Sequence, residues 1–325
     1  MTIHKSVLLK ESIEALNLKE GMIVVDATLG GGGHSREILK IIGDSSLPAA
    51  CLSGRQGRQG KLIAFDADAL AIEKFQASIK KEDKKNVILV NANFRNLEKE
   101  LEKLGIEKVD AILADIGYSS DQLEGAERGI SFQLDSPLDM RFDQNQELTA
   151  RKIVNEYSEE ELERVLREFG EEKFARNIVR GILKYREKKS IENTKELAEI
   201  VSAHVPGKYR SGKISPATKT FQAIRIEVNR ELESLEIFVP SALGALRSGG
   251  RLAIISFHSL EDRIVKEKFR ENARGCICPK DFPVCLCQKT AKVKIITKRP
   301  LTSGATELAE NPRARSAKLR VCEVI

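Results

Sequence analysis

The fold of this chain is decided by one stretch of sequence, Met22-Ile-Val-Val-Asp-Ala-Thr-Leu-Gly-Gly-Gly-Gly-His-Ser35. Met22 to Val25 is a short apolar run without polar alternation, which predicts a strand buried on both faces. The glycines Gly30 to Gly33 follow it, and glycines there allow a tight turn and let backbone N–H groups approach a ligand at a helix start. Arg36 to Leu39 begins that helix. The stretch predicts the first strand-turn-helix unit of a nucleotide-binding doubly wound fold. A tight turn with no ligand is the alternative.

Three further apolar runs predict a parallel sheet. They are Lys61–Asp66, Asn86–Asn91 and Val109–Asp115. Because helical patterns separate these strands, we expect an open α/β sheet. An acid at the end of the second strand of this fold class hydrogen-bonds ribose hydroxyls, which is the role predicted for Asp66. A helix N-cap is the alternative for Asp66. The segment Gly43 to Gly60 has no periodicity and predicts a long exposed loop.

The pattern changes to helices in the middle of the chain. From about Ser119 to Pro216 strand signals nearly vanish, and charged amphipathic patterns predict helices over Glu159–Phe169, Lys173–Arg186 and Thr194–His204. We therefore expect a helical insertion domain over 119–216 inside a discontinuous sheet domain of residues 1–118 and 217–325. The remaining predicted elements are helices over His4–Leu18 and Thr218–Val239 and strands over Leu252–Phe257, Val293–Thr297 and Lys318–Val324, which give about seven strands in all.

Composition fits a soluble globular protein. The 325 residues are 41% hydrophobic and 31% charged, with a net charge of +6. No apolar run approaches a membrane span, and the N-terminus lacks a signal-peptide core. We expect a cytoplasmic protein with no membrane partner, in which the six cysteines are not disulfide-bonded.

Five segments carry a family resemblance. They are Asp26-Ala-Thr-Leu-Gly-Gly-Gly-Gly-His-Ser35, Pro137-Leu-Asp-Met-Arg141, Lys219-Thr-Phe-Gln-Ala-Ile-Arg-Ile-Glu-Val-Asn-Arg-Glu-Leu232, Ser256-Phe-His-Ser-Leu-Glu-Asp-Arg-Ile-Val-Lys266 and Asn311-Pro-Arg-Ala-Arg-Ser316. In this order they resemble the bacterial MraW (RsmH) family over essentially the whole chain. The resemblance implies a Rossmann-like class I methyltransferase that uses S-adenosyl-L-methionine. It also implies methylation of the exocyclic N4 of one cytidine in the decoding (peptidyl-site) region of 16S ribosomal RNA, with the small ribosomal subunit or its precursor as partner. The resemblance places the helical insertion on the RNA-substrate side, and it does not imply an oligomeric state.

The resemblance also implies a set of site residues. Carried over position by position, the cofactor contacts are Gly32, Gly33, His34, Asp66, Phe94, Asp115 and Gln122. We interpret the glycines as admitting the methionine moiety, and Phe94 as an apolar wall for the adenine. For His34, a packed histidine without a ligand is the alternative. Asp115 is the catalytic candidate that accepts a hydrogen bond from the target amine, and a carboxylate that only binds cofactor is its alternative.

The chain departs from the family at one position beside this set. The family usually has a small apolar residue where this chain has Tyr118, and Asp115-Ile-Gly-Tyr118 thereby resembles the Asp/Asn-Pro-Pro-Tyr signature of amino-group methyltransferases. Tyr118 is the candidate to stack on the cytosine, and a residue that only shapes the wall of the site is the alternative.

Two other functions are compatible with parts of the sequence. A nicotinamide-dependent oxidoreductase would need a cleaner G-x-G-x-x-G and leaves the helical insertion unexplained. A non-catalytic RNA-binding protein would use the basic residues Arg180, Lys184, Arg186, Lys188, Lys189, Lys208, Arg210, Lys213 and Lys219. Charged helix faces are usually only solvated, whereas beside a cofactor cleft they suit an RNA backbone. Cofactor binding separates these functions.

Four cysteines form the last distinctive pattern, Cys276-x-Cys278 and Cys285-x-Cys287. Four thiolates can bind zinc tetrahedrally, although C-x-C is less diagnostic than C-x-x-C. A surface loop of reduced thiols is the alternative. The predicted catalytic site contains no metal.

Overall fold

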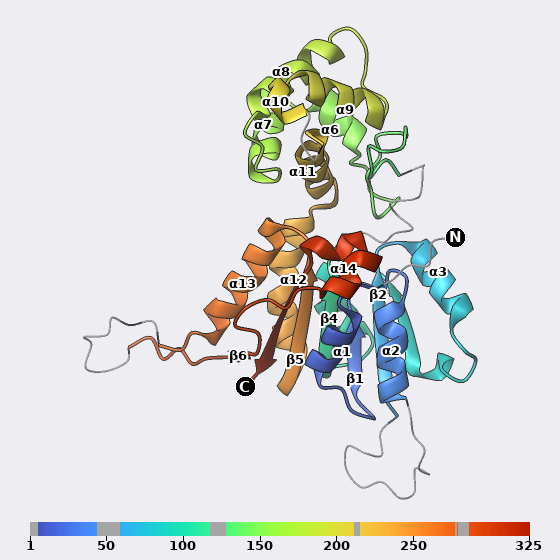
Figure 1. Cartoon of the computed structure of the whole chain (residues 1–325). Helices are drawn as coiled ribbons and strands as arrows, with labels where there is room; N and C mark the ends of the chain where they lie inside the picture. The colour runs from blue at the N-terminus through green and yellow to red at the C-terminus, as the bar shows by residue number, and fades with distance from the viewer. Residues whose placement is uncertain (1–5, 44–58, 118–127, 211–214, 277, 279–285) are drawn as a thin grey trace, which may run out of the picture. The chain divides into compact units, whose positions relative to one another are not determined.

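The computed structural model describes residues 6–43, 59–117, 128–210, 215–276, 278 and 286–325 (Figure 1). The chain divides into two compact units. One, the sheet unit, comprises Met1–Gly117 and Leu232–Ile325, and the other, the helical unit, comprises Tyr118–Glu231. The helical unit thus continues past Pro216, where the sequence placed the end of the insertion.

The sheet unit is built on a mixed sheet. Its order among the described residues is β3-β2-β1-β4-β5-β7-β6. The strands are β1 (Ile23–Asp26), β2 (Lys61–Asp66), β3 (Val87–Asn91), β4 (Val109–Asp115), β5 (Leu246–Ser256), β6 (Val293–Ile295) and β7 (Lys318–Val324). β1 to β5 pair in parallel, and β7 is antiparallel to both β5 and β6. The predicted α/β fold with about seven strands is confirmed.

Helices cover both faces of this sheet. They are α1 (Leu9–Leu16), α2 (Gly33–Ile42), α3 (Ala69–Ser78), α4 (Leu97–Lys103), α12 (Glu231–Ala245), α13 (Ser259–Ala273) and α14 (Ala305–Glu310), with the 3-10 turns η3 (Lys84–Asn86), η4 (Phe94–Asn96) and η5 (Pro312–Ser316). Successive strand residues point to opposite faces. Val25 and Ile63 accordingly pack in one cluster with Phe238 of α12, whereas Val24 and Leu62 pack in another with α1 and α2.

The helical unit has a separate apolar core. Its helices are α6 (Ala150–Glu156), α7 (Glu159–Glu168), α8 (Ala175–Arg186), α9 (Thr194–Ala203), α10 (Gly207–Arg210) and α11 (Ala217–Asn229). Ser158 and Glu161 form a capping box at the start of α7, and Asn193 caps α9. Such caps satisfy N–H groups that have no partner within the helix, which is why these helices begin close to the predicted positions.

The prediction of one helix over Thr218–Val239 is wrong. The chain forms α11 and α12, separated at Arg230, which has a left-handed backbone with φ of +48°. The Asn229 side chain donates to the Met140 carbonyl and accepts from the Phe142 N–H, both at 2.8 Å, and so fixes the end of α11. α11 packs on α6, α7 and α9, and therefore belongs to the helical unit.

Three other predictions concern loops and termini. The predicted loop between Gly43 and Gly60 lies mostly outside the described residues, but a side chain at Gly60 would collide with the Ile42 backbone, so the loop begins and ends at neighbouring positions. α1 begins at Leu9, after Leu8 with φ of +51°, rather than at His4. No helix in the described part of the chain is long and apolar enough to cross a membrane.

Candidate cofactor and active site

Three aspartates meet at the carboxyl edge of the sheet. Asp26, Asp66 and Asp115 end β1, β2 and β4, which are neighbours in the order β2-β1-β4. Asp26 pairs with Ala64 of β2 and with Leu113 of β4. Asp66 and Asp115 therefore lie two residues further along their strands than Asp26 does. In doubly wound sheets, ligands bind outside the carboxyl ends of the strands.

The glycine turn between β1 and α2 is shaped by packing. Gly32 has φ of +73°, and a side chain there would collide with the Phe75 ring. A side chain at Gly33 would collide with the Ser6 hydroxyl. Protein atoms therefore occupy the space that these side chains would take, and the need for glycine does not depend on admitting a ligand. The first N–H groups of a helix such as α2 have no intrahelical acceptor, and such groups are what binds a ligand at a helix start.

The Asp66 carboxylate is fixed in place by two backbone N–H groups. Gly30 N donates to Oδ2 and Asp68 N donates to Oδ1, both at 2.8 Å. The N-cap of α3 is Asp68, whose carboxylate accepts from Leu70 N at 3.1 Å. Asp66 is therefore not the cap. Because each carboxylate oxygen accepts more than one hydrogen bond, the fixed carboxylate can also accept from ligand hydroxyls.

Asp26 lies at the candidate site, and the sequence interpretation gave it no role. It is 1% exposed, and its oxygens accept from the Ser35 hydroxyl at 2.6 Å and from Thr28 N at 3.2 Å. Burial raises its pKa to about 7, even though both hydrogen bonds favour the ionised form. The sequence did contain a signal for Asp26. It is the last residue of its strand, as Asp66 and Asp115 are of theirs.

Asp115 carries a buried acceptor. Its side chain is 19% exposed, its Oδ2 lies 3.7 Å from His34 Nδ1, and its backbone N–H donates to the Thr28 hydroxyl at 2.6 Å. Its Oδ1 is buried and accepts no hydrogen bond from the part of the chain that the structure describes. Burial raises the Asp115 pKa to about 7, and the negative charge of Asp26 adds to this effect. A buried oxygen without a hydrogen-bond donor is rare in proteins. Asp115 Oδ1 therefore suits a site in which a bound ligand donates the hydrogen bond.

The structure describes two of the remaining predicted site residues, His34 and Phe94. His34 is buried in the first turn of α2, facing Asp115. Phe94 follows β3, and its ring packs edge-to-face on Phe238 with 5.1 Å between centroids. Tyr118 and Gln122 lie outside the described residues. The structure thus brings Asp66, Asp115, His34 and the glycine turn together, and Phe94 follows a strand that ends at the same edge.

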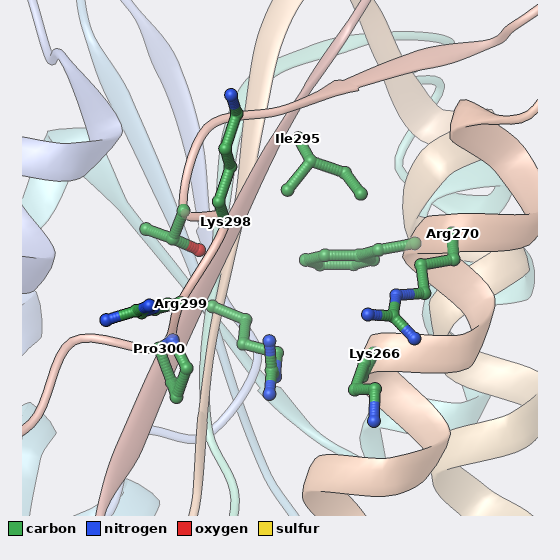
Figure 2. Close-up of a pocket in the computed structure, with 9 residues that line it drawn as sticks. Lys266, Arg270, Ile295, Lys298, Arg299 and Pro300 are labelled. Carbon is green, nitrogen blue, oxygen red and sulfur yellow. The ribbon is translucent and has the colours of Figure 1, made fainter.

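A basic cavity lies elsewhere on the sheet unit (Figure 2). Its volume is about 470 Å³, and its lining residues are Lys266, Phe269, Arg270, Ile295, Thr297, Lys298, Arg299, Pro300 and Arg320. No carboxylate is among these lining residues, although Asp262 pairs with Arg320 at 2.6 Å. The sequence interpretation missed this cavity because its cations come from α13, the segment after β6, and β7.

The sheet order, the glycine turn and the acid-terminated strands define the class of doubly wound α/β enzymes that bind a nucleoside-containing cofactor at the carboxyl edge. Within this class the chain belongs to the MraW methylase family, whose sequence model matches residues 1–325. It is therefore an S-adenosylmethionine-dependent methyltransferase, as predicted, and the fixed Asp66 carboxylate suits the ribose of that cofactor.

Curated relatives agree with this assignment. The chain is 49% identical over 322 residues to the ribosomal RNA small subunit methyltransferase H of Lachnospira eligens, covering 99% of this chain and 98% of the relative. It is also 49% identical over 323 residues to the protein of that name from Clostridium botulinum strain Kyoto, covering 99% of each.

Similarity to solved structures is remote. An rRNA methylase from Streptococcus thermophilus gives a TM-score of 0.42 at 12% identity, covering 99% of this chain and 98% of the other. A putative methyltransferase from Streptococcus mutans in complex with SAH gives a TM-score of 0.42 at 13% sequence identity, covering 99% of this chain and 99% of the other. Family membership rests on the sequence matches alone.

Proposed function

We propose that this chain methylates the exocyclic N4 of a specific cytidine in the decoding (peptidyl-site) region of 16S ribosomal RNA. The observation that carries the proposal is the buried Asp115 Oδ1, which accepts no hydrogen bond from the described residues at the end of a strand beside Asp66. The relatives named as small-subunit ribosomal RNA methyltransferases support an RNA substrate. The partner is the small ribosomal subunit or its precursor, and the location is the cytoplasm.

Methylation of a cytosine amine requires a hydrogen-bond and proton acceptor such as Asp115. The lone pair of a cytosine amine is delocalised into the ring, so the enzyme must orient the amine and take up a proton. When bound, S-adenosylmethionine supplies an electrophilic methyl group. The Asp115 carboxylate accepts a hydrogen bond from the amine, and its pKa of about 7 suits proton transfer near neutral pH.

The remaining predicted residues have binding roles. In this proposal the backbone of Gly32, Gly33 and His34 would hold the cofactor at the start of α2, and Asp66 would accept hydrogen bonds from the ribose hydroxyls. Phe94 would form the apolar wall for the adenine. Gln122 would contact the cofactor, and Tyr118 would stack on the cytosine.

Methylation at ring carbon C5 is disfavoured. That reaction needs a cysteine nucleophile beside the cofactor, whereas Cys276, Cys278 and Cys287 follow α13 and Cys322 is in β7. Cys51 and Cys285 lie outside the described residues. Methylation of an exocyclic amine needs no covalent adduct with the enzyme. The position of the described cysteines therefore favours methylation at N4 over methylation at C5.

The basic cavity is the better-supported RNA contact. Several insertion cations proposed from the sequence have structural partners: Lys189 pairs with Glu196, Arg186 donates to the Val154 carbonyl, and Lys219 donates to the Glu171 carbonyl. The cavity, by contrast, gathers Lys266, Arg270, Lys298 and Arg299 on its walls, besides Arg320, which pairs with Asp262. Phosphate groups bind such surfaces and release counterions.

Mapping the methyl group tests the reaction. We expect mass spectrometry of small-subunit RNA to find N4-methylcytidine at one decoding-region position, absent from cells lacking the gene and restored by the wild-type chain. Complementation by Asp115→Asn should leave that cytidine unmodified. Finding that the gene-dependent methyl group is on C5 or on a ribose oxygen would contradict the proposal.

Binding titrations test the RNA contact. We expect the double change Lys298→Ala and Arg299→Ala to weaken RNA binding and to reduce the salt slope by about 1 for each phosphate that the protein no longer neutralises. Affinity for S-adenosylmethionine should not change. An unchanged salt slope would place the RNA elsewhere.

A further inference from the structure

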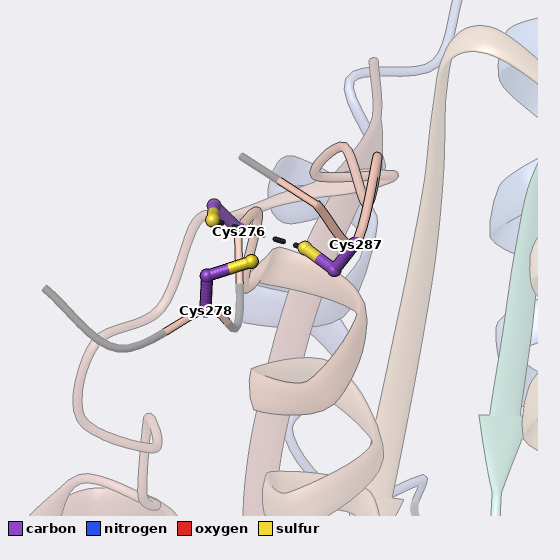
Figure 3. A group of neighbouring side chains, drawn as sticks. All are labelled: Cys276, Cys278 and Cys287. Carbon is purple, nitrogen blue, oxygen red and sulfur yellow. Dashed lines mark hydrogen bonds between the residues drawn. The ribbon is translucent and has the colours of Figure 1, made fainter. Parts of the chain in front are cut away.

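Cysteines from two separate segments meet between α13 and β6 (Figure 3). The sulfur atoms of Cys276, Cys278 and Cys287 all lie within 4.8 Å of one another. Cys276 is exposed, and the other two are half-buried. The predicted site residues do not include these thiols, and Cys285, the fourth cysteine of the pattern, lies outside the described residues.

The sulfur spacing matches ligands of one metal ion. Cys276 Sγ and Cys287 Sγ are 3.7 Å apart. A disulfide would bring them to about 2.05 Å. Zinc binds thiolate sulfur at about 2.3 Å in tetrahedral geometry, which places two ligand sulfurs about 3.8 Å apart. The observed spacing therefore fits two corners of a zinc tetrahedron, and Cys278 lies within reach of a third corner.

The ligand type narrows the choice of metal. The cluster contains three thiols and, among the described residues, no carboxylate or histidine within the same group. Soft thiolate ligands select zinc and other thiophilic ions over magnesium or calcium. We propose that Cys276, Cys278 and Cys287 bind one zinc ion.

The position of the cluster indicates a structural role. α13 follows the carboxyl end of β5 and runs back along the sheet, so the cysteines that follow α13 lie away from the edge with Asp66 and Asp115. The base of this segment is already closed, because Lys292 N donates to the Asn272 carbonyl at 2.8 Å and the Lys289 ammonium donates to the Glu271 carbonyl at 3.0 Å. A metal ion on the three sulfurs joins Cys276 and Cys278 to Cys287 in the same way.

Metal analysis of the full-length protein tests the site. We expect about one zinc per chain after purification without chelators, and no zinc in the triple variant Cys276→Ser, Cys278→Ser, Cys287→Ser. The matched control is Cys322→Ala, which changes a buried cysteine of β7 and should keep the zinc. Wild-type protein without zinc, or zinc retained by the triple variant, would overturn the proposal.

A second measurement does not depend on folding of the variant. Chelator-treated wild-type protein is titrated with Co²⁺, and thiolate-to-cobalt charge-transfer absorption is expected to saturate at one equivalent. The melting temperature should rise with metal while the affinity for S-adenosylmethionine stays the same, as a site remote from the cofactor requires. Absence of the charge-transfer band would exclude thiolate ligation.

Discussion

Two carboxylates of the helical unit and two of the sheet unit have pKa values that are shifted in opposite directions. In the helical unit, acids pair with cations on the surface: Arg151 and Lys189 lower the pKa values of Glu192 and Glu196. In the sheet unit, burial raises the pKa values of Asp26 and Asp115 to about 7. The first arrangement favours the ionised form of the acid. The second stabilises neither charge state well, which is a feature of sites that act on a ligand.

Asp115→Asn should have the largest effect. If Asp115 accepts the proton of the amine, kcat at saturating cofactor should fall by a factor of about 10²–10⁴. The wild-type kcat should itself decrease as pH falls through about 7, because protonated Asp115 cannot act as acceptor. Steady-state kinetics against pH measures both effects. Asp110→Asn is the control, since Asp110 lies at the other end of β4 and binds Ile23 N. A rise in the cofactor KM with kcat unchanged would instead assign Asp115 to cofactor binding.

Breaking a buried ion pair in the helical unit should have the second-largest effect. Arg225 and Glu231 form two hydrogen bonds of 2.8 and 2.9 Å, and their side chains are 11% and 5% exposed. Arg225→Met leaves the Glu231 carboxylate buried without its cation and should cost about 3–5 kcal/mol of unfolding free energy. Denaturant unfolding measures this loss. Arg151→Met, which breaks the exposed pair with Glu192, should leave stability nearly unchanged. Equal effects of the two changes would refute this distinction between buried and exposed pairs.

Asp26→Asn should change how stability depends on pH. The folded-state pKa of Asp26 is raised from 3.8 to about 7, so its contribution is present below about pH 4 and lost as pH rises through about 7. At 1.36 kcal/mol for each pKa unit, the variant should gain up to about 4 kcal/mol relative to wild type across that window. Glu196→Gln should show the opposite sign, because a lowered pKa contributes stability at neutral pH that disappears as pH falls. Urea unfolding from pH 4 to 8 compares them, and curves of the same sign would contradict the contrast.

Asp66→Ala should have the smallest of the four effects. Loss of a hydrogen bond to a charged acceptor weakens binding by roughly 1.5–3 kcal/mol, or about one to two decades in the Kd for S-adenosylmethionine. Titration calorimetry measures it. Asp68→Ala removes the cap of α3 beside Asp66 and should leave the Kd unchanged. Unchanged affinity in Asp66→Ala would remove Asp66 from the cofactor site.

Local patterns predicted the part of the site that depends on strand ends. Asp66 and Asp115 follow apolar runs whose bounds match β2 and β4. The raised pKa of Asp26 was not predictable, because it comes from burial by residues distant in sequence. The break at Arg230 was also missed, since one left-handed residue does not interrupt an amphipathic pattern. The basic cavity combines three segments, which no local pattern contains.

The position of β7 has a consequence for biosynthesis. β7 is the last strand in chain order, yet it lies between β5 and β6 and pairs with both. Until Lys318–Val324 leaves the ribosome, β5 and β6 each present an unpaired edge to other nascent chains. This side of the sheet therefore cannot close until β7 has been made, and the edge of β5 is open to wrong pairing in that interval.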